Sequence, residues 1–184
     1  MNNRSIRTVV AIGVGAALFW IIGYFIKLPI PFVPNTNIQL QYGVQALFAL
    51  LFGPLAGFLI GFIGHTFIDL MSGQVWWFWV LASAFFGGTV GLLHKRIRLE
   101  EGVFGGREIV LFNVVQAIAV ILFMGILAPA GDVISSQEPL NKVIVQGIGS
   151  SLVNIVSVAV VGTLLIKVYA STRVKEGSLS QDDE

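Results

Sequence analysis

Long hydrophobic stretches alternate with short polar ones along almost the whole chain. They predict six membrane-spanning helices, over about residues 8–26, 38–52, 55–71, 75–93, 109–128 and 143–170. Most approach the ~20 residues that a helix needs to cross a bilayer, although the second is shorter. A Gly53-Pro54 pair predicts a tight turn after the second span, because proline disfavours helix in the residue before it. The pattern predicts an all-α membrane protein, with a polar loop over 129–142 and a polar cytoplasmic tail over 171–184.

Composition supports a single transmembrane domain. The 184 residues are 55% hydrophobic and 11% charged, which is too apolar for an ordinary soluble domain. The absence of cysteine excludes disulfide bonds, thiolate metal sites and cysteine nucleophiles. A net charge of +1 does not favour nucleic acid as a partner. The first hydrophobic run lacks a small-residue cleavage site, so we interpret it as a retained helix and not as a signal peptide.

Basic residues are distributed unevenly between the two sides that six spans create. Nine fall on the side of the termini: Arg4, Arg7, Lys95, Arg96, Arg98, Arg107, Lys167, Arg173 and Lys175. Only Lys27 and Lys142 fall on the other side. The positive-inside rule therefore predicts that both termini are cytoplasmic. Adding or removing one span would destroy this asymmetry.

An uncharged polar segment, from Pro34 to Gln45, lies between the first two spans. Polar side chains that face lipid without a partner are costly, so these groups are expected to face a cavity, a ligand or water. Asn35 lies in this segment, and Asn37, Gln41 and Gln45 follow at intervals of four residues. This spacing places the last three on one side once the second helix begins. We predict that the segment forms part of a pocket for a small polar molecule.

A second polar stripe descends the sixth span from the same outer face. It consists of Gln146, Ser150 and Asn154, again four residues apart. Residues at this spacing share one face of a helix. The two stripes are candidate walls of one pocket that opens to the outside.

Three tryptophans, Trp76, Trp77 and Trp79, lie at the start of the fourth span. Tryptophan is enriched at membrane interfaces without any ligand. Adjacent residues on a helix point about 100° apart, however, so the three cannot all face lipid. Trp77 or Trp79 is a candidate flat wall for a planar ring.

His65 and Asp69 lie four residues apart in the third span and share a face. Ionisable residues inside membrane helices suggest a function, here a proton relay, a ligand contact or an acid–base couple. Alternatively, Asp69 is solvated at the interface and His65 bonds to a neighbouring helix. A metal site is not expected, because His94 lies on the opposite side and two ligands do not complete a site.

Small residues recur every four positions in two of the spans. The first span contains two interleaved pairs, Ala11 with Gly15 and Gly13 with Ala17, and the third contains Gly53, Gly57 and Gly61. Such residues let helix backbones approach closely in a membrane. The glycines of the third span favour packing within the subunit. Two stripes on the first span are more than one neighbour needs, so a partner protein is an equal candidate there.

Several of these segments resemble the substrate-capture (S) subunits of energy-coupling-factor (ECF) vitamin transporters. They are residues 8–17, 34–39, 52–54, 61–65, 76–77 and 169–173. The likeness covers nearly the whole chain and is closest to the riboflavin-type and hydroxymethylpyrimidine-type branch. It implies the six-helix S-component fold in a bacterial cell membrane, with an outward pocket built from the first loop, the third and fifth loops and the outer ends of the later helices.

The resemblance also implies partner proteins, a transmembrane coupling subunit and two ATPases, and no cofactor. In that family an alanine-x-x-x-alanine pattern on the first helix contacts the coupling subunit. Ala11 with Gly15, or Gly13 with Ala17, takes that place here. ATP hydrolysis on the partners makes the loaded S subunit topple in the membrane. The chain has no G-x-x-x-x-G-K-[ST] loop, so it cannot itself hydrolyse ATP through such a loop.

The pocket residues predict a small, uncharged, ring-shaped vitamin or precursor. Amides supply both hydrogen-bond donors and acceptors, and a phosphorylated or polycarboxylate ligand would need more cations than Lys27 and Lys142. A hydroxymethylpyrimidine-like or pyridoxine-like ligand is preferred, with riboflavin next. Two alternatives remain open, a stand-alone proton-coupled carrier and an intramembrane enzyme. Both would use His65 and Asp69, although no nucleophile or metal constellation accompanies them.

Overall fold

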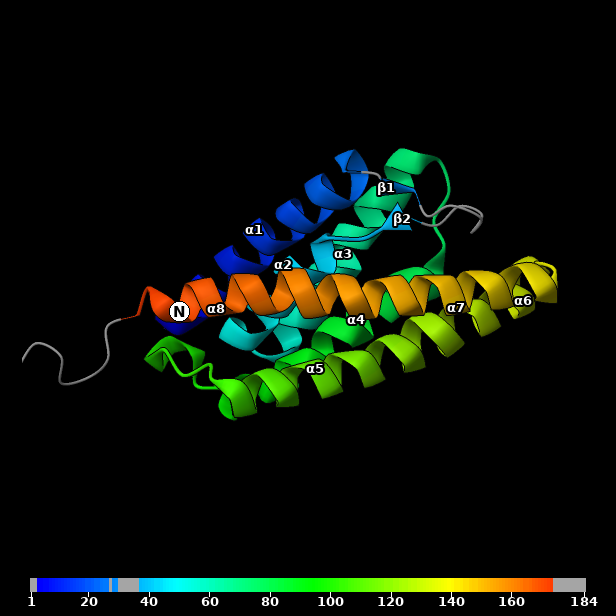
Figure 1. Ribbon diagram of the computed structural model, residues 1–184. Coiled ribbons are helices and arrows are strands. Elements are labelled where there is room, and N and C mark those ends of the chain that lie inside the picture. Colours follow the sequence, from blue (N-terminus) through cyan, green and yellow to red (C-terminus); the bar gives the residue numbers. More distant parts are fainter. Residues whose placement is uncertain (1–2, 27, 30–36, 174–184) are drawn as a thin grey trace, which may run out of the picture.

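The computed structural model describes residues 3–26, 28–29 and 37–173. In this part of the chain six helical segments pack into an elongated bundle (Figure 1). The first four are α1 (Asn3–Phe25), α2 (Gln41–Phe52), α3 (Pro54–Ser72) and α4 (Trp77–Gly91). The short 3₁₀ helices η1 (Leu92–Lys95) and η2 (Leu99–Glu101) follow α4. Two-residue strands, β1 (Leu28–Pro29) and β2 (Asn37–Ile38), pair antiparallel between α1 and α2.

The last two helical segments run almost the whole length of the bundle. The fifth joins α5 (Gly106–Val120), the π-helix η3 (Ile121–Leu127) and α6 (Ala128–Ser136). The sixth joins α7 (Leu140–Ser157), the π-helix η4 (Val158–Gly162) and α8 (Thr163–Ser171). The two lie side by side and run in opposite directions (Figure 1). Together they form the long side of the molecule.

Five of the six segments are long and apolar enough to cross a membrane. The exception is α2, whose 12 residues span only about 18 Å at 1.5 Å per residue. This helix lies in the interior, where Tyr42, Ala46 and Ala49 are almost completely buried. Other helices therefore surround α2 on most sides. Because they cover it, α2 does not need the length that crosses a bilayer.

Most predicted boundaries are displaced by a few residues, and two of the differences involve polar segments. The second helix begins at Gln41 and not at 38, because Asn37 and Ile38 pair with β1. Most of the predicted loop over 129–142 is helical, and only 137–139 separate α6 from α7. Pro129 is tolerated inside the fifth segment because the wider π-helical turn of η3 ends just before it. The predicted tail lies outside the described residues from position 174 onward.

Glycines set the close approach of α3 and α4. A Cβ atom on Gly57 would overlap the carbonyl oxygen of Gly87, and one on Gly61 would overlap that of Ser83. Packing of the third-span glycines within the subunit is therefore confirmed. The predicted turn is confirmed too, because Gly53 adopts a φ of 88° and Pro54 begins α3. Only glycine takes this φ readily.

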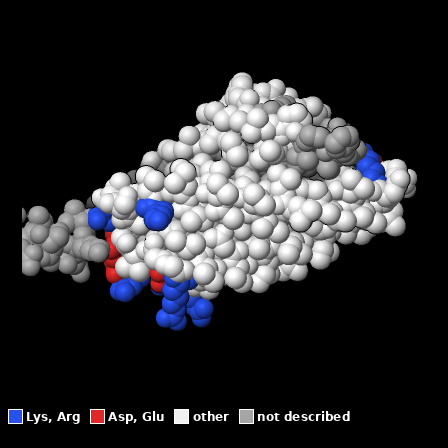
Figure 2. Space-filling model, in the orientation of Figure 1, with Lys and Arg blue, Asp and Glu red and all other residues white. Residues whose placement is uncertain are grey.

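The two ends of the bundle differ in their content of charged residues (Figure 2). Among the described side chains, seven basic ones gather at the end formed by the start of α1, the start of α5 and the end of α8: Arg7, Lys95, Arg96, Arg98, Arg107, Lys167 and Arg173. Lys142 lies at the opposite end, in the first turn of α7. The positive-inside rule assigns the basic end to the cytoplasm and the Lys142 end to the outside.

Candidate ligand-binding pocket

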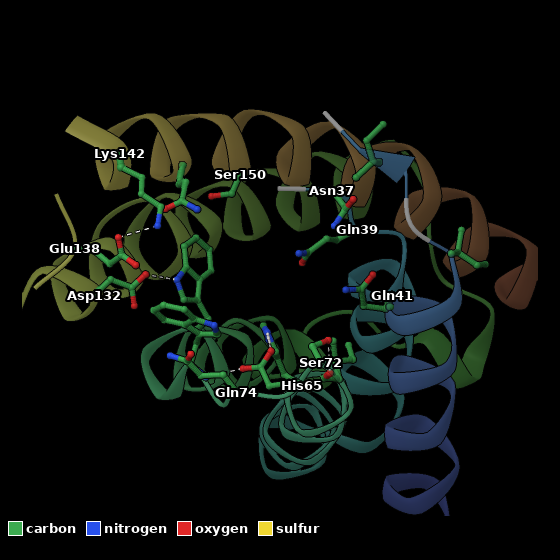
Figure 3. Close-up of a pocket in the computed structure, with 18 residues that line it drawn as sticks. Asn37, Gln39, Gln41, His65, Ser72, Gln74, Asp132, Glu138, Lys142 and Ser150 are labelled. Carbon is green, nitrogen blue, oxygen red and sulfur yellow. Dashed lines mark hydrogen bonds and ion pairs between the residues drawn. The ribbon is translucent and has the colours of Figure 1, made fainter. Parts of the chain in front are cut away.

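A cavity of about 470 Å³ opens at the outer end of the bundle (Figure 3). This volume lies in the range of small-molecule pockets, roughly 300–1,000 Å³. The described residues that line it come from α1, β2, α2, α3, α4, α6, α7 and their connections. They are Gly23, Ile26, Asn37, Ile38, Gln39, Gln41, His65, Ile68, Asp69, Ser72, Gln74, Trp76, Trp79, Asp132, Glu138, Lys142, Gln146 and Ser150. Most of them carry polar groups.

Amide side chains form one side of the cavity. Asn37, Gln39 and Gln41 lie together there (Figure 3). The Gln41 side chain is only 3% exposed, and it makes no hydrogen bond within the described residues. The Oε1 atom of Gln39 is also buried without a hydrogen-bond partner among them. Because buried polar groups are normally paired, this side of the cavity is suited to binding a polar molecule.

Indole rings contribute an aromatic wall, and the structure distinguishes between the tryptophans. Trp79 lines the cavity, as does Trp76. The Nε1–H group of Trp79 donates a hydrogen bond to Asp132 Oδ2 over 2.6 Å. Trp77 is 54% exposed, stacks on Phe62 and is absent from the lining. Of the two predicted candidates, only Trp79 can therefore touch a molecule in the cavity.

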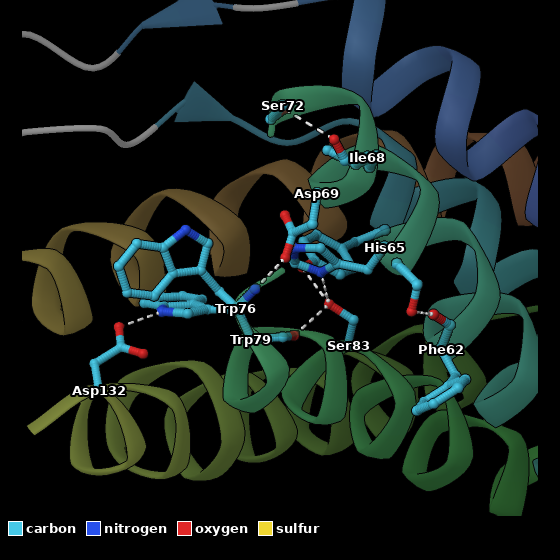
Figure 4. A network of polar contacts seen from close by, with 11 residues as sticks. Phe62, His65, Ile68, Asp69, Ser72, Trp76, Trp79, Ser83 and Asp132 are labelled. Carbon is cyan, nitrogen blue, oxygen red and sulfur yellow. Dashed lines mark hydrogen bonds and ion pairs between the residues drawn. The ribbon is translucent and has the colours of Figure 1, made fainter. Parts of the chain in front are cut away.

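A polar network connects the cavity to the interior (Figure 4). His65 Nδ1 lies 2.5 Å from Ser83 Oγ, and the Tyr42 hydroxyl lies 2.7 Å from the same oxygen. Asp69 Oδ2 accepts a hydrogen bond of 2.8 Å from the backbone N–H of Trp76. His65 thus bonds to a neighbouring helix, as one of the two interpretations expected, but Asp69 is buried and bonded to the Trp76 backbone and is not solvated at the interface. Both His65 and Asp69 also line the cavity and are accessible to a molecule bound there.

Charged groups form the side of the cavity that faces the amides (Figure 3). Asp132 comes from α6, Lys142 from α7 and Glu138 from the short connection between them. Lys142 Nζ donates to Glu138 Oε2 over 2.7 Å. The sequence places Lys142 on the outer side, but the polarity of 129–142 predicts a loop, so Asp132 and Glu138 are not among the predicted pocket residues. The four-residue spacing of Glu138 and Lys142, typical of ion pairs on a helical turn, was the available signal.

Two predicted pocket residues lie below the cavity and not in its lining. Gln45 Nε2 donates to the carbonyl oxygens of Gly57 and Ser83, over 2.9 and 2.8 Å, and so joins α2 to α3 and α4. Asn154 is buried, with its Nδ2 atom 3.4 Å from Met124 Sδ. Both polar stripes therefore continue past the floor of the cavity into the core. Gln146 and Ser150 do line the cavity, whereas Asn35 lies outside the described residues.

The two small-residue pairs of α1 face different ways. Ala11 and Gly15 are buried, and a Cβ atom on Gly15 would lie 2.6 Å from Ile60 Cδ1. Gly13 and Ala17 are exposed, and no atom lies within 4 Å of a Cβ built on Gly13. The first pair packs inside the subunit, and the second leaves a shallow, open face on the helix.

Comparisons with known proteins agree with this architecture. A family model described as "ECF-type riboflavin transporter, S component" matches residues 3–171. The chain is 55% identical over 183 residues to the UPF0397 protein YdcD of Lactococcus lactis subsp. lactis, covering 99% of this chain and 100% of that protein. It is 54% identical over 185 residues to a UPF0397 protein of Streptococcus sanguinis, covering 99% and 100%. No solved structure matches the chain significantly.

The chain therefore belongs to the family of ECF-type riboflavin transporter S components. This confirms the resemblance found in the sequence and the all-helical S-component fold. The protein is a substrate-binding subunit for vitamin uptake in the bacterial membrane, and not an enzyme. The family assignment does not support a stand-alone carrier.

Proposed function

We propose that this S component captures a small, water-soluble vitamin or precursor with a nitrogen-containing aromatic ring in its outer cavity. One observation carries the proposal. The buried amide of Gln41 has no partner within the described residues and points into a cavity that Trp76 and Trp79 also line. An aromatic wall suits a planar ring, and an amide can donate and accept hydrogen bonds.

A single-ring ligand of the hydroxymethylpyrimidine or pyridoxine type is the first candidate, and riboflavin is the second. Lys142 is the only basic side chain in the described lining besides His65, and it is already paired with Glu138. Binding of a phosphate group normally needs an available cation, so phosphorylated forms are disfavoured. The cavity of about 470 Å³ is also large enough for a drug-sized ring system, which keeps riboflavin in consideration.

Titration of the purified protein with these three compounds tests the proposal. Binding is followed by the quenching of tryptophan fluorescence. We expect one of them to bind with a Kd below about 1 µM, corresponding to roughly −8 kcal/mol. If the protein, freed of any co-purified molecule, binds none of the three, the proposed substrate class is wrong.

Removing an amide from the cavity should weaken binding without affecting the fold. Asn37→Ala and Gln41→Ala are each expected to lower ligand affinity about tenfold, because one hydrogen bond to a buried ligand is worth about 1–1.5 kcal/mol. Isothermal titration calorimetry measures the effect. Asn141→Ala is the matched control, since Asn141 is exposed on α7 and lies outside the lining. Unchanged affinity in both cavity variants would refute the proposed role of the amides.

We further propose that the exposed face of α1 around Gly13 and Ala17 contacts the transmembrane coupling subunit, which acts with two ATPases. Gly13→Leu should then reduce co-purification with these partners several-fold while ligand binding is retained, because a large side chain prevents close helix approach. Ala130→Leu, at an exposed position of α6, is the control. Normal co-purification of Gly13→Leu would contradict the assignment. Gly15→Leu is unsuitable as a test, because its side chain would collide with Ile60 and Phe48 inside the subunit.

A further inference from the structure

The outer cavity carries an excess of negative charge. Its described lining contains three carboxyl groups, on Asp69, Asp132 and Glu138, but only one lysine and one histidine. Lys142 is engaged with Glu138. The sequence predicts an uncharged ligand, because Asp132 and Glu138 are not among its candidate pocket residues. In a membrane protein, unbalanced charges of this kind are costly and usually have a functional partner.

Asp69 and Asp132 each keep one carboxylate oxygen available to a ligand. One oxygen of Asp69 accepts a hydrogen bond from the Trp76 backbone, and the other lies 3.6 Å from His65 Nε2, which is too far for a hydrogen bond. One oxygen of Asp132 accepts from the Trp79 indole, and Oδ1 has no hydrogen bond within the described residues. Both hydrogen bonds come from neutral N–H groups and leave the negative charges in place, and His65 is the basic side chain within ion-pair distance of Asp69.

The two carboxylates flank a pair of indole rings. Figure 4 shows Trp76 and Trp79 between Asp69 and Asp132. Aromatic faces attract cations through the negative potential of the ring, and the effect is larger where water is excluded. Carboxylates beside aromatic faces form an environment suited to an organic cation.

An independent observation indicates that a ligand completes this site. Gln41 is 3% exposed and points into the cavity from the opposite side, without a partner among the described residues (Figure 3). A ligand that reaches Gln41 would therefore extend across the cavity from the carboxylates. A metal ion is a poor alternative occupant, because the described residues include no group of three or more side chains suited to hold one.

We propose that the cavity selects a ligand with a protonated nitrogen, which lies between Asp69, Asp132 and the two indoles, while a hydroxyl or amide group of the ligand pairs with Gln41. This inference rests on the proposed function and specifies the charge of the substrate. It predicts exclusion of anionic forms of the same ring, because they would meet two unbalanced carboxylates.

Probes that share a ring and differ in charge test the proposal. Pyridoxamine carries an ammonium group, pyridoxine has a hydroxyl at the same position, and pyridoxine 5′-phosphate is anionic. Benzamidine, benzamide and benzoate form a second set of nearly equal shape. In calorimetric titrations of the wild-type protein we expect the cation of a set to bind at least about tenfold more tightly than its neutral partner, and the anion more weakly still.

Asp132→Asn removes the negative charge of this side chain but keeps its size and shape. An asparagine oxygen can still accept the hydrogen bond from Trp79, so the fold should be retained. We expect this variant to lose about tenfold in affinity for the cation and to change by less than about twofold for the neutral probe. Glu100→Gln, which removes the same charge at the cytoplasmic end, is the control and should alter neither.

Three results would overturn the proposal. The first is a neutral probe that binds the wild-type protein as tightly as the cation, and the second is an equal loss of both probes in Asp132→Asn. The third is that no cationic probe binds while the molecule that co-purifies with the protein is neutral or anionic. Each of these results contradicts the preference for a cation but leaves the proposed vitamin-binding function intact. If no probe binds and no small molecule co-purifies, the proposed function fails as well.

Discussion

Replacing Trp79 by alanine is expected to lower ligand affinity by about 30- to 100-fold, because loss of ring stacking costs roughly 1–3 kcal/mol and part of the cavity wall is removed. The indole also holds Asp132 through a 2.6 Å hydrogen bond, so its removal frees that carboxylate to turn away. Calorimetry is the suitable measurement, since the substitution removes a fluorophore. Trp79→Phe retains a flat ring without the N–H group and should lie between the wild type and Trp79→Ala.

The neighbouring tryptophan provides the control. Trp77 lies outside the lining and stacks on Phe62, so Trp77→Ala should leave ligand affinity within about twofold of the wild type. Both residues are tryptophans at the start of α4, so the two variants differ only in which face of the helix loses its indole ring. Equal losses in both variants would show that the tryptophans act by anchoring the protein in the membrane and not by forming the pocket.

The second large effect concerns stability. Gly87→Ala is expected to destabilise the protein by about 2–3 kcal/mol, because overpacking a tight contact typically costs 1–3 kcal/mol. The added methyl group would overlap the carbonyl oxygen of Gly57 and the side-chain amide of Gln45, at the point where α2, α3 and α4 meet. The thermal midpoint in detergent should fall by about 5–10 °C, since each kcal/mol shifts it by about 2–4 °C in a protein of this size.

Gly88→Ala adds the same methyl group one position further along α4. There the nearest atom, Phe58 Cβ, would be 3.6 Å away, which is an ordinary contact. Alanine favours helix over glycine by up to about 1 kcal/mol, so this variant should be as stable as the wild type or slightly more stable. A fall in midpoint for Gly88→Ala equal to that of Gly87→Ala would contradict the assignment of the close contact to Gly87.

The helices could be predicted from the sequence because hydrophobic runs of membrane length are a strong signal. The same signal failed at the outer end of the fifth helical segment, where it predicted a loop. This end contains Asp132 and Ser135, and their polarity imitates a loop although the backbone is helical. These polar side chains belong to a helix because they face a cavity and its hydrogen bonds, as Asp132 does with Trp79. Hydropathy along the chain does not contain that information.

The site could be predicted in part for a similar reason. Spacing by four residues correctly indicated the shared faces of Gln41 with Gln45 and of Ser150 with Asn154. It did not indicate where the cavity ends, because that depth depends on the packing of Gly57, Gly61 and Ser83 around the Gln45 amide. The sequence likewise left Trp77 and Trp79 as equal candidates. Their difference depends on the rotation of α4 against its neighbours.

The structure also relates the site to the core. Asp69 holds the start of α4 through the Trp76 backbone, and His65 connects the same face of α3 to Ser83. Ser83 in turn contacts Tyr42 on α2 and the carbonyl group of Trp79. The cavity is thus built on side chains that are held by hydrogen bonds to three helices. Such support limits the motion of the pocket walls and favours tight binding of a rigid ring.

The central claim is that the outer cavity holds a small nitrogen-containing aromatic vitamin or precursor. Mass spectrometry of the small molecules released from purified protein tests it most directly, with wild type and Trp79→Ala prepared in parallel. We expect the wild-type protein to release one such compound in nearly equimolar amount and the variant to release little of it. The account would be contradicted if the wild type released no such compound, or if Trp79→Ala retained as much of it.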